Sequence, residues 1–304
     1  MSFEVCFLGT GAAIPSSKRN PSAKFITCNN RHILIDCGEG TQMQIRKFGL
    51  KLQKIAHILI SHLHGDHFFG LVGLISTMHL LGRTSGVTIY CPAELEQIIK
   101  NQLELGHAKL DFSIQFVHLQ NVKSALIFED RIIEIHSFQL NHRIPTWGFL
   151  IKEKNKERTL LVDVAKKAGL LLEHYPKLKN NQKVEYNNKT YYPEEFTLPP
   201  KPSFSYAYIS DTAYTEDFLN FIQGTTHIYH EATFIDKDIE RARQTYHSTA
   251  SQAAKFALIC GAKQLFMGHF SARYESVNQH LDEARMIFPE SYTAEDGLIL
   301  KIRD

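Results

Sequence analysis

The feature that most constrains this chain is a cluster of metal-ligand side chains directly after an apolar β-type run. The run Ile55–Ile60 is followed by Ser61-His62-Leu63-His64-Gly65-Asp66-His67. A lone histidine rarely binds a metal. Here, however, four potential ligands in the spacing H-x-H-x-D-H follow the end of one strand directly, a pattern that indicates a metal site. Imidazole and carboxylate groups are the ligands that Zn²⁺ and similar divalent ions prefer. The chain must therefore fold so that other strand ends complete a metal site here.

Three further candidate ligands lie where an apolar β-type run meets a loop. Such strand ends are the places where α/β sheets carry their sites. Histidines in other contexts are weaker candidates, and we expect ordinary surface roles for those at positions 79, 107, 174 and 280. The three candidates, each with its preceding run, are His142 after Ile132–Leu140, Asp211 after Phe204–Ser210, and His269 after Gln264–Met267.

Short β-type runs alternate with helical patterns over nearly the whole chain. This arrangement predicts an α/β fold with two sheets packed face to face and helices outside, in one domain over residues 1–304. The expected strands are Glu4–Leu8, Phe25–Thr27, His32–Asp36, Ile55–Ile60, Ser113–Val117, Ala125–Phe128, Ile132–Leu140, Trp147–Lys152, Thr159–Val162, Phe204–Ser210, His227–Tyr229, Gln264–Met267 and Leu298–Lys301. The expected helices are Thr41–Lys47, Phe68–Leu81, Pro92–Leu105, Thr215–Ile222, Ser248–Cys260 and Val277–Phe288.

The composition limits the partners and the compartment. Lys and Arg number 34 against 32 Asp and Glu, so the net charge of +2 excludes a globally basic nucleic-acid binder and leaves only local basic patches. No apolar run approaches the roughly 18 residues of a membrane span, and the first residues lack the pattern of a signal peptide. The five cysteines show no C-x-x-C spacing, so we expect reduced thiols in a cytoplasmic protein.

One stretch, at about 164–202, departs from the alternating pattern. It carries five prolines and shows weak periodicity, and between 164 and 190 it holds six lysines against two glutamates. We therefore expect an inserted, flexible basic arm in this segment. A solvated surface insertion without function is the simpler interpretation of such a lysine-rich segment. A basic arm for an anionic polymer is the functional one.

The ligand spacing resembles that of the metallo-β-lactamase superfamily, whose hallmark is H-x-H-x-D-H with later His, Asp and His ligands. The resemblance extends over nearly the full length to the ribonuclease Z family, endonucleases that trim the 3′ trailer from precursor tRNA. The motifs that make it specific are His230-Glu231-Ala232-Thr233, His247-Ser248-Thr249-Ala250 and Gly268-His269-Phe270-Ser271-Ala272-Arg273-Tyr274, with Phe7-Leu8-Gly9-Thr10-Gly11, Asp36-Cys37-Gly38-Glu39-Gly40-Thr41 and Asn141-His142-Arg143-Ile144-Pro145 before them.

This resemblance implies an αββα metallo-β-lactamase sandwich and a zinc-dependent endoribonuclease that leaves a 3′-hydroxyl on the tRNA. It implies two divalent metal ions per chain, with Zn²⁺ the expected metal, and no organic cofactor. The spacing alone supports only the ligand set; the resemblance assigns one ion to His62, His64 and His142, the other to Asp66, His67 and His269, and a bridging role to Asp211.

The resemblance also implies roles outside the ligand set. Asp66 can accept the proton of the attacking water, and His247, oriented by Glu231, can protonate the leaving oxygen. On sequence alone, His247 could equally be a surface residue beside the helix that begins near Ser248. Candidate phosphate-binding residues near the ligands are Lys18, Arg19, Ser271 and Arg273.

The family resemblance further implies a homodimer and a basic arm that binds the tRNA body. The sequence departs from the bacterial arm in one respect, because Gly169 is the only glycine between 164 and 202 and no proline follows it. An enzyme of the same superfamily that acts on a small phosphodiester or a thioester is the alternative function. A binding module with an inactive site is a third interpretation, which the complete ligand set disfavours.

Overall fold

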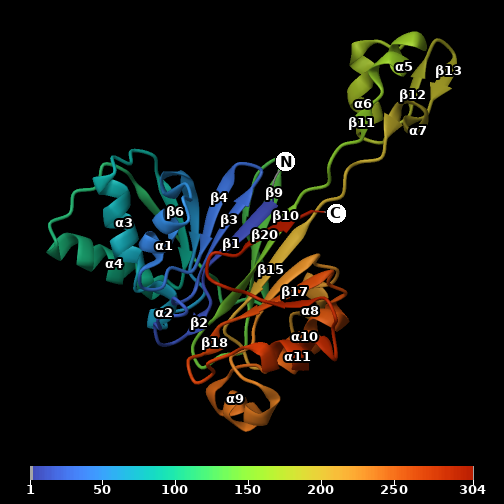
Figure 1. Ribbon diagram of the computed structural model, residues 1–304. Helices are drawn as coiled ribbons and strands as arrows, with labels where there is room; N and C mark the ends of the chain where they lie inside the picture. Colours follow the sequence, from blue (N-terminus) through green and yellow to red (C-terminus); the bar gives the residue numbers. More distant parts are fainter. Residues whose placement is uncertain (1–2, 304) are drawn as a thin grey trace. The chain divides into compact units, whose positions relative to one another are not determined.

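The computed structural model describes residues 3–303, which form two compact units (Figure 1). The first unit holds the residues up to Lys152 together with Phe204–Arg303, and the second is Glu153–Ser203. All the sequence-predicted site residues belong to the first unit. The segment expected to be a basic arm, 164–202, lies within the second unit, which begins before it.

The first sheet of the larger unit has seven strands in the order β20-β1-β3-β4-β5-β6-β7. The strands from β20 to β4 are antiparallel neighbours, and those from β4 to β7 run parallel. The strands are β1 (Phe3–Gly9), β3 (Ala23–Cys28), β4 (Arg31–Ile35), β5 (Ile55–Leu59), β6 (Val87–Cys91), β7 (Ile114–His118) and β20 (Ile299–Ile302).

The second sheet has the strand order β19-β17-β16-β15-β10-β9-β8. Its first four strands run parallel, while β10 is antiparallel to β15 and β8 to β9. A small parallel pair of β2 (Gly11–Ala12) and β18 (Phe270–Ser271) lies outside both sheets. The strands of the second sheet are β8 (Ser124–Glu129), β9 (Ile133–Gln139), β10 (Trp147–Glu153), β15 (Ser205–Ile209), β16 (His227–Glu231), β17 (Gln264–Gly268) and β19 (Ser291–Thr293).

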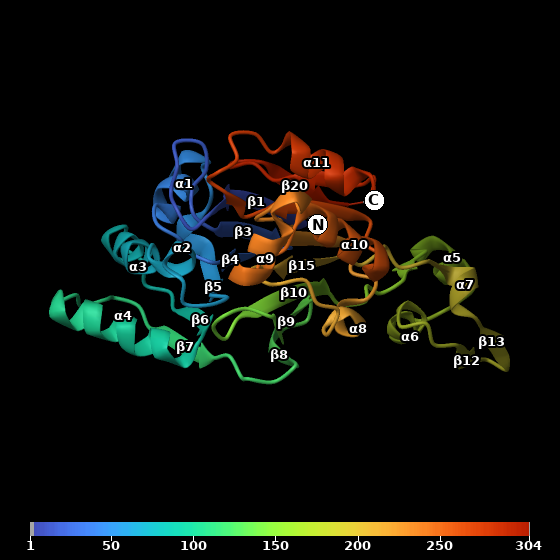
Figure 2. The same cartoon turned by 90° about the horizontal axis from the view of Figure 1, so that it is seen from below.

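Helices cover the outer face of each sheet, and three separate apolar clusters hold these layers together (Figure 2). One cluster fills the space between the sheets, and the other two lie between a sheet and its helices. This α/β sandwich confirms the predicted fold. The helices are α1 (Thr41–Lys47), η1 (Leu52–Lys54), α2 (Gly65–Phe68), α3 (Leu71–Leu80), α4 (Ala93–Leu105), α8 (Leu219–Ile222), η3 (Asp236–Asp238), α9 (Ile239–Thr245), α10 (Ala250–Cys260) and α11 (Asn278–Arg285).

The smaller unit has a core of its own, built from Ala165, Leu170, Leu178, Val184 and Phe196. Its weak sequence periodicity did not indicate this regular structure. The expected strand over residues 159–162 ends early, because Val162 already begins a helix. The elements are β11 (Thr159–Leu160), α5 (Val162–Lys167), η2 (Leu172–His174), α6 (Tyr175–Lys179), β12 (Val184–Tyr186), β13 (Lys189–Tyr191), α7 (Pro193–Phe196) and β14 (Thr197–Leu198).

Two expected helices of the larger unit differ from the structure. The one expected to begin at Thr215 has only its last turn, since the Thr215 hydroxyl accepts a hydrogen bond from the Asp217 amide and so competes with helical bonding. The one expected over residues 68–81 is interrupted at Gly70, whose amide donates to Cys37 O at 2.9 Å. No helix within residues 3–303 is long and apolar enough to cross a membrane.

Buried polar side chains also depart from expectation. His174 and His280, expected at the surface, are both buried. Burial lowers the pKa of His280 to about 4. More unusual is Lys24 of β3, which is fully buried and lies over the rings of Tyr208 and Tyr229 from the opposite sheet, with Nζ 5.0 and 4.2 Å from the ring centroids. A lysine ammonium therefore occupies the apolar layer between the sheets.

Lys24 gives the stability of this protein a specific pH dependence. Burial lowers its pKa to about 8, an effect that the carboxylates of Asp36 and Asp211 partly offset. In the unfolded chain the pKa returns to about 10.4. Between these values the unfolded state binds more protons than the folded state, so the free energy of unfolding rises with pH by up to about 1.4 kcal/mol per unit. Below pH 8 both states are protonated and this contribution is constant.

We therefore predict that the wild-type protein gains stability relative to Lys24→Met between pH 8 and 10. Urea unfolding of both proteins, in the same metal state and at several pH values, measures this difference. Curves that stay parallel over this range would show that the pKa of Lys24 is not lowered in the folded protein, and hence that its ammonium is not buried.

Candidate metal centre and active site

The predicted ligands come together at strand ends of both sheets. The motif that follows β5 supplies His62 and His64, and α2 carries Asp66 and His67 in a single turn. Gly65 begins this turn, and a Cβ atom there would lie 2.2 Å from the ring of Phe69, so a larger residue would force that ring to move. The ligands from the second sheet follow β9, β15 and β17.

The first ligand group contains three histidines and one carboxylate. His62 Nε2 lies 3.1 Å from His64 Nδ1, which in turn lies 3.3 Å from His142 Nε2. Asp211 Oδ2 is 3.6 Å from His62 Nε2. The ligand atoms of all four residues lie within 4.8 Å of one another.

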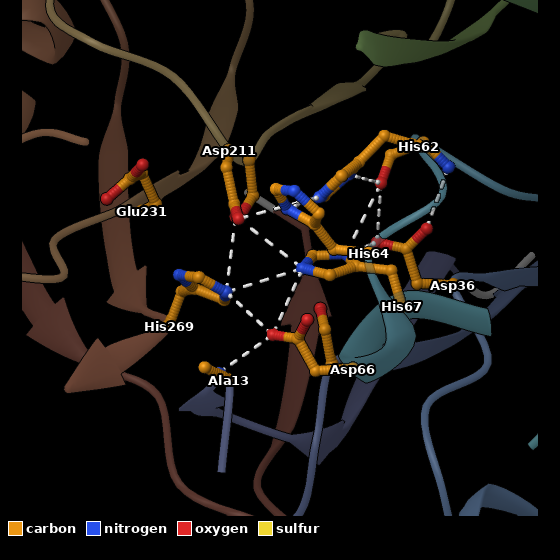
Figure 3. Close-up of polar contacts among 12 residues, drawn as sticks. Ala13, Asp36, His62, His64, Asp66, His67, Asp211, Glu231 and His269 are labelled. Atoms are coloured by element: carbon orange, nitrogen blue, oxygen red, sulfur yellow. Dashed lines mark hydrogen bonds and ion pairs between the residues drawn. The ribbon is translucent and has the colours of Figure 1, made fainter. Parts of the chain in front are cut away.

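The second group contains Asp66, His67 and His269 (Figure 3). His67 Nε2 lies 3.3 Å from His269 Nε2 and 3.6 Å from Asp66 Oδ2. The other oxygen of Asp211, Oδ1, is 3.2 Å from His269 Nε2 and 3.6 Å from His67 Nε2. Asp211 therefore directs one carboxylate oxygen toward each group.

The chemistry of these donors fits divalent metal ions. Four ligands placed tetrahedrally at about 2.0–2.1 Å from a Zn²⁺ ion lie roughly 3.3–3.4 Å apart, close to the separations of 3.1–3.6 Å in both groups. The second ring nitrogen of each of three ligand histidines also has an oxygen partner. His67 Nδ1 is 2.7 Å from Asp36 Oδ2, His142 Nδ1 is 2.9 Å from Tyr246 O, and His269 Nδ1 is 3.0 Å from Thr233 Oγ1. Such contacts orient an imidazole so that its remaining nitrogen can bind a metal.

Asp36 supports the centre from beneath, and sequence reasoning did not identify this role. Its carboxylate is fully buried and accepts hydrogen bonds from the amide and the hydroxyl of Ser61, at 2.8 and 3.0 Å. The same carboxylate contacts His67. Asp36 ends an expected strand and lies within a motif quoted for the family resemblance, and this was the available signal.

The charges around Asp66 favour its ionised form. Burial alone would raise the pKa of Asp66, but the charge of His67 and a hydrogen bond with His269 hold it below its ordinary value. The backbone amide of Ala13 also donates to Asp66 Oδ2 at 2.8 Å. Asp66 is therefore fixed as a carboxylate at the edge of the second ligand group.

His247 and Glu231 form a hydrogen-bonded pair beside the ligands, with 2.7 Å between His247 Nδ1 and Glu231 Oε1. Glu231 is fully buried and also accepts bonds from the amides of Thr212 and Ser248 and from the hydroxyl of Thr233. Burial would lower the pKa of His247, but the charge of Glu231 and its hydrogen bond outweigh this and raise the pKa to about 9. The ring of His247 is thus held in one orientation and protonated at neutral pH. Because Asp211, Glu231, His247 and His269 also have ligand atoms within 4.8 Å of one another, this pair adjoins the metal centre directly.

A cavity of about 800 Å³ opens over these groups. Two of the four predicted phosphate-binding residues, Ser271 and Arg273, line it. Lys18 and Arg19 are not among its lining residues: Lys18 Nζ lies 3.4 Å from the Glu275 carbonyl, and the Arg19 guanidinium lies over the ring of Phe270. Two arginines that the sequence analysis did not select also line the cavity, Arg143 and Arg241. Arg143 follows a predicted ligand directly, whereas no sequence signal marked Arg241.

Comparison with known proteins identifies relatives over nearly the whole chain. Ribonuclease Z of Bacteroides fragilis is 37% identical over 301 residues, which cover 99% of each protein. The crystal structure of the short form of human tRNase Z has a TM-score of 0.73 and 31% identity, and the match covers 99% of this chain and 100% of that one. The metallo-β-lactamase fold protein YhfI of Bacillus subtilis shares the fold, with a TM-score of 0.69 and 15% identity over 99% of this chain and 100% of that one.

A family model described as "Anti-Pycsar protein Apyc1" matches residues 3–177. This match covers more than half of the chain but ends inside the second unit. The match to ribonuclease Z of B. fragilis continues through the second sheet and its strand-end residues. The chain therefore belongs over residues 3–177 to the family described as Anti-Pycsar protein Apyc1 and, over nearly its whole length, to the ribonuclease Z family.

Proposed function

We propose that this protein is a metal-dependent endoribonuclease that removes the 3′ trailer from precursor tRNA. It hydrolyses one phosphodiester and leaves a 3′-hydroxyl on the tRNA. The observation that carries the proposal is the presence of two His/Asp ligand groups and the His247–Glu231 pair at one cavity, in a chain of the ribonuclease Z family. The human structural relative is a tRNase Z, which supports precursor tRNA as the substrate.

We infer that the two ligand groups hold two divalent ions, and that the metal is Zn²⁺. His62, His64 and His142 would hold one ion, and Asp66, His67 and His269 the other, with Asp211 shared between them. The donor separations and the oriented imidazoles support this assignment. When bound, such ions polarise phosphate oxygens and lower the pKa of water.

The protein groups then divide the proton transfers between them. In an in-line hydrolysis, the water oxygen bonds to phosphorus, and the bond from phosphorus to the ribose 3′-oxygen breaks. Asp66 accepts the proton that the water loses. His247 gives a proton to the departing 3′-oxygen, since its pKa of about 9 keeps it protonated at neutral pH. Glu231 stabilises the charged ring and fixes its orientation.

The second unit supplies the basic surface that we propose binds the tRNA body. Three of its lysines are engaged in ion pairs, Lys156 with Glu153, Lys179 with Glu157 and Lys183 with Glu185. Lys166, Lys167, Lys177 and Lys189 are exposed and have no ion pair within the described residues. These four side chains can contact phosphates without first losing a carboxylate partner.

We also propose that the protein is a homodimer in the cytoplasm. The family resemblance supports the dimer. The cytoplasmic location is supported by the five cysteines, which are buried and form no disulfide within the described residues, since disulfides are rare in that compartment.

The metal requirement is tested by chelation. We predict that treatment with a chelator abolishes cleavage of both precursor tRNA and bis(p-nitrophenyl) phosphate, and that Zn²⁺ restores both. Elemental analysis should give about two ions per chain for the wild type and fewer for His67→Ala. His118→Ala is the matched control, because His118 also lies at a strand end, the last residue of β7, but its Nε2 contacts Glu96 outside the cluster. Full activity with one ion per chain would contradict the two-ion assignment.

The role of His247 as an acid is tested with a modified leaving group. We predict that His247→Ala slows cleavage of precursor tRNA by about 10²–10⁴-fold. With sulfur in place of the bridging 3′-oxygen, the leaving group is a weak base that needs no proton. The same variant should then cleave at close to the wild-type rate. An equal defect on both substrates would assign His247 to binding or to structure.

The arm is tested by changing only its charge. We predict that Lys166→Glu, Lys167→Glu and Lys177→Glu together raise KM for precursor tRNA and leave hydrolysis of bis(p-nitrophenyl) phosphate unchanged, because the small substrate has no tRNA body to be held. Each lost phosphate contact should reduce the slope of log affinity against log salt by roughly 0.7–0.9. Lys183→Glu is the control, since that lysine already contacts Glu185. An unchanged KM in the triple variant would show that the arm does not bind tRNA through these residues.

A further inference from the structure

The proposed metal centre is connected by hydrogen bonds to the buried lysine between the sheets. Lys24 Nζ donates to Ser22 Oγ at 2.8 Å and lies over two tyrosine rings. No carboxylate of residues 3–303 lies within ion-pair distance of it. A buried ammonium without a direct counter-ion is costly to maintain, so the groups that its hydrogen bonds reach are of interest.

The bonds continue from Lys24 to a carboxylate through two hydroxyl groups. Ser22 Oγ lies 3.1 Å from Tyr208 Oη, and Tyr208 Oη donates to Asp36 Oδ2 at 2.6 Å. Because Tyr208 uses its hydrogen on Asp36, the Ser22 hydroxyl must be the donor to Tyr208. Every donor in this chain therefore points away from the ammonium and toward Asp36, an arrangement in which successive hydrogen bonds polarise one another.

Asp36 connects this chain to a proposed metal ligand. Its Oδ2 atom accepts the bond from Tyr208 and also lies 2.7 Å from His67 Nδ1. The hydrogen on His67 therefore sits on Nδ1, and Nε2 faces His269 and Asp211. The members of the chain, Lys24, Ser22, Tyr208, Asp36 and His67, are all fully buried.

We propose that Lys24 is a positioning residue that acts through Ser22, Tyr208 and Asp36 to limit how strongly His67 donates electrons to a bound metal ion. A carboxylate beneath a ligand histidine raises the basicity of that ligand. Here the Asp36 carboxylate also accepts a hydrogen bond from the Tyr208 hydroxyl, which the Lys24 ammonium polarises through Ser22. The negative charge of Asp36 therefore polarises His67 less. The ion is held less tightly and remains a stronger Lewis acid. We call the hydrogen-bonded series Lys24, Ser22, Tyr208, Asp36 and His67 the relay. Because the pKa of Lys24 is about 8, its ammonium is charged at neutral pH.

This inference rests on the proposed metal centre and is tested by metal affinity rather than by turnover. Lys24→Met removes the charge at nearly constant length, and Tyr208→Phe removes only the hydroxyl that contacts Asp36. We expect both variants to bind Zn²⁺ more tightly than the wild type, by up to roughly tenfold, in competition with a chromophoric chelator. The visible absorption of the Co²⁺-loaded proteins should shift in both, because the donor strength of His67 changes.

Tyr206→Phe is the matched control. Tyr206 lies on the same strand and is equally buried, but its hydroxyl has no hydrogen-bond partner within the described residues. Its loss should leave the Zn²⁺ affinity and the Co²⁺ spectrum unchanged. Circular dichroism checks that each variant is folded.

The sign of the change separates the possible outcomes. If Lys24 and Tyr208 merely held Asp36 in place, their loss would loosen His67 and weaken Zn²⁺ binding. Weaker or unchanged affinity with an unaltered Co²⁺ spectrum in both variants would overturn the relay while leaving the metal centre intact. A folded wild-type protein that binds no Zn²⁺ would overturn the metal centre and the relay together.

Discussion

The site depends on the packing of the two sheets against each other, because neither sheet carries a complete set of ligands. The first sheet contributes the motif after β5, and the second contributes His142, Asp211 and His269. The apolar layer between the sheets holds them together, and each ligand group combines residues from both sheets with ligand atoms within 4.8 Å of one another. Asp211 shows this dependence most directly, because it follows a strand of the second sheet and contacts His62 and His67, which follow a strand of the first. The ligand geometry therefore depends on how the two sheets are packed.

The strand ends could be predicted from sequence because local patterns mark them. The dense ligand motif after Ile55–Ile60 and the single ligands after later runs were visible in this way, and the structure places them together. Two kinds of feature could not be predicted from local sequence patterns. The regular structure of the smaller unit depends on a few scattered apolar residues, such as Leu178 and Phe196, whose spacing has no period. The helix expected from Thr215 fails because of a side-chain bond that competes with the backbone.

Residues that act through others were also hidden in the sequence. Lys24 belongs to no quoted motif, and the motif that contains Asp36 did not indicate its role. The roles proposed for both residues follow from their side-chain contacts in the folded chain. Lys24 in particular breaks the rule that charged side chains stay at the surface. Beneath the metal centre, the charges are arranged so that carboxylates orient histidines, as Asp36 does for His67 and Glu231 does for His247. In the proposed mechanism, the same arrangement of a carboxylate hydrogen-bonded to an imidazole would serve metal binding at His67 and proton donation at His247.

We conclude that this chain cuts a precursor tRNA at its 3′ trailer by hydrolysis that expels a ribose 3′-oxygen. The most direct test is to map the new ends formed by the purified protein in water enriched with ¹⁸O. We predict a 3′-hydroxyl on the tRNA and a 5′-phosphate on the trailer, with ¹⁸O in that phosphate. A 3′-phosphate or 2′,3′-cyclic phosphate on the tRNA would contradict it.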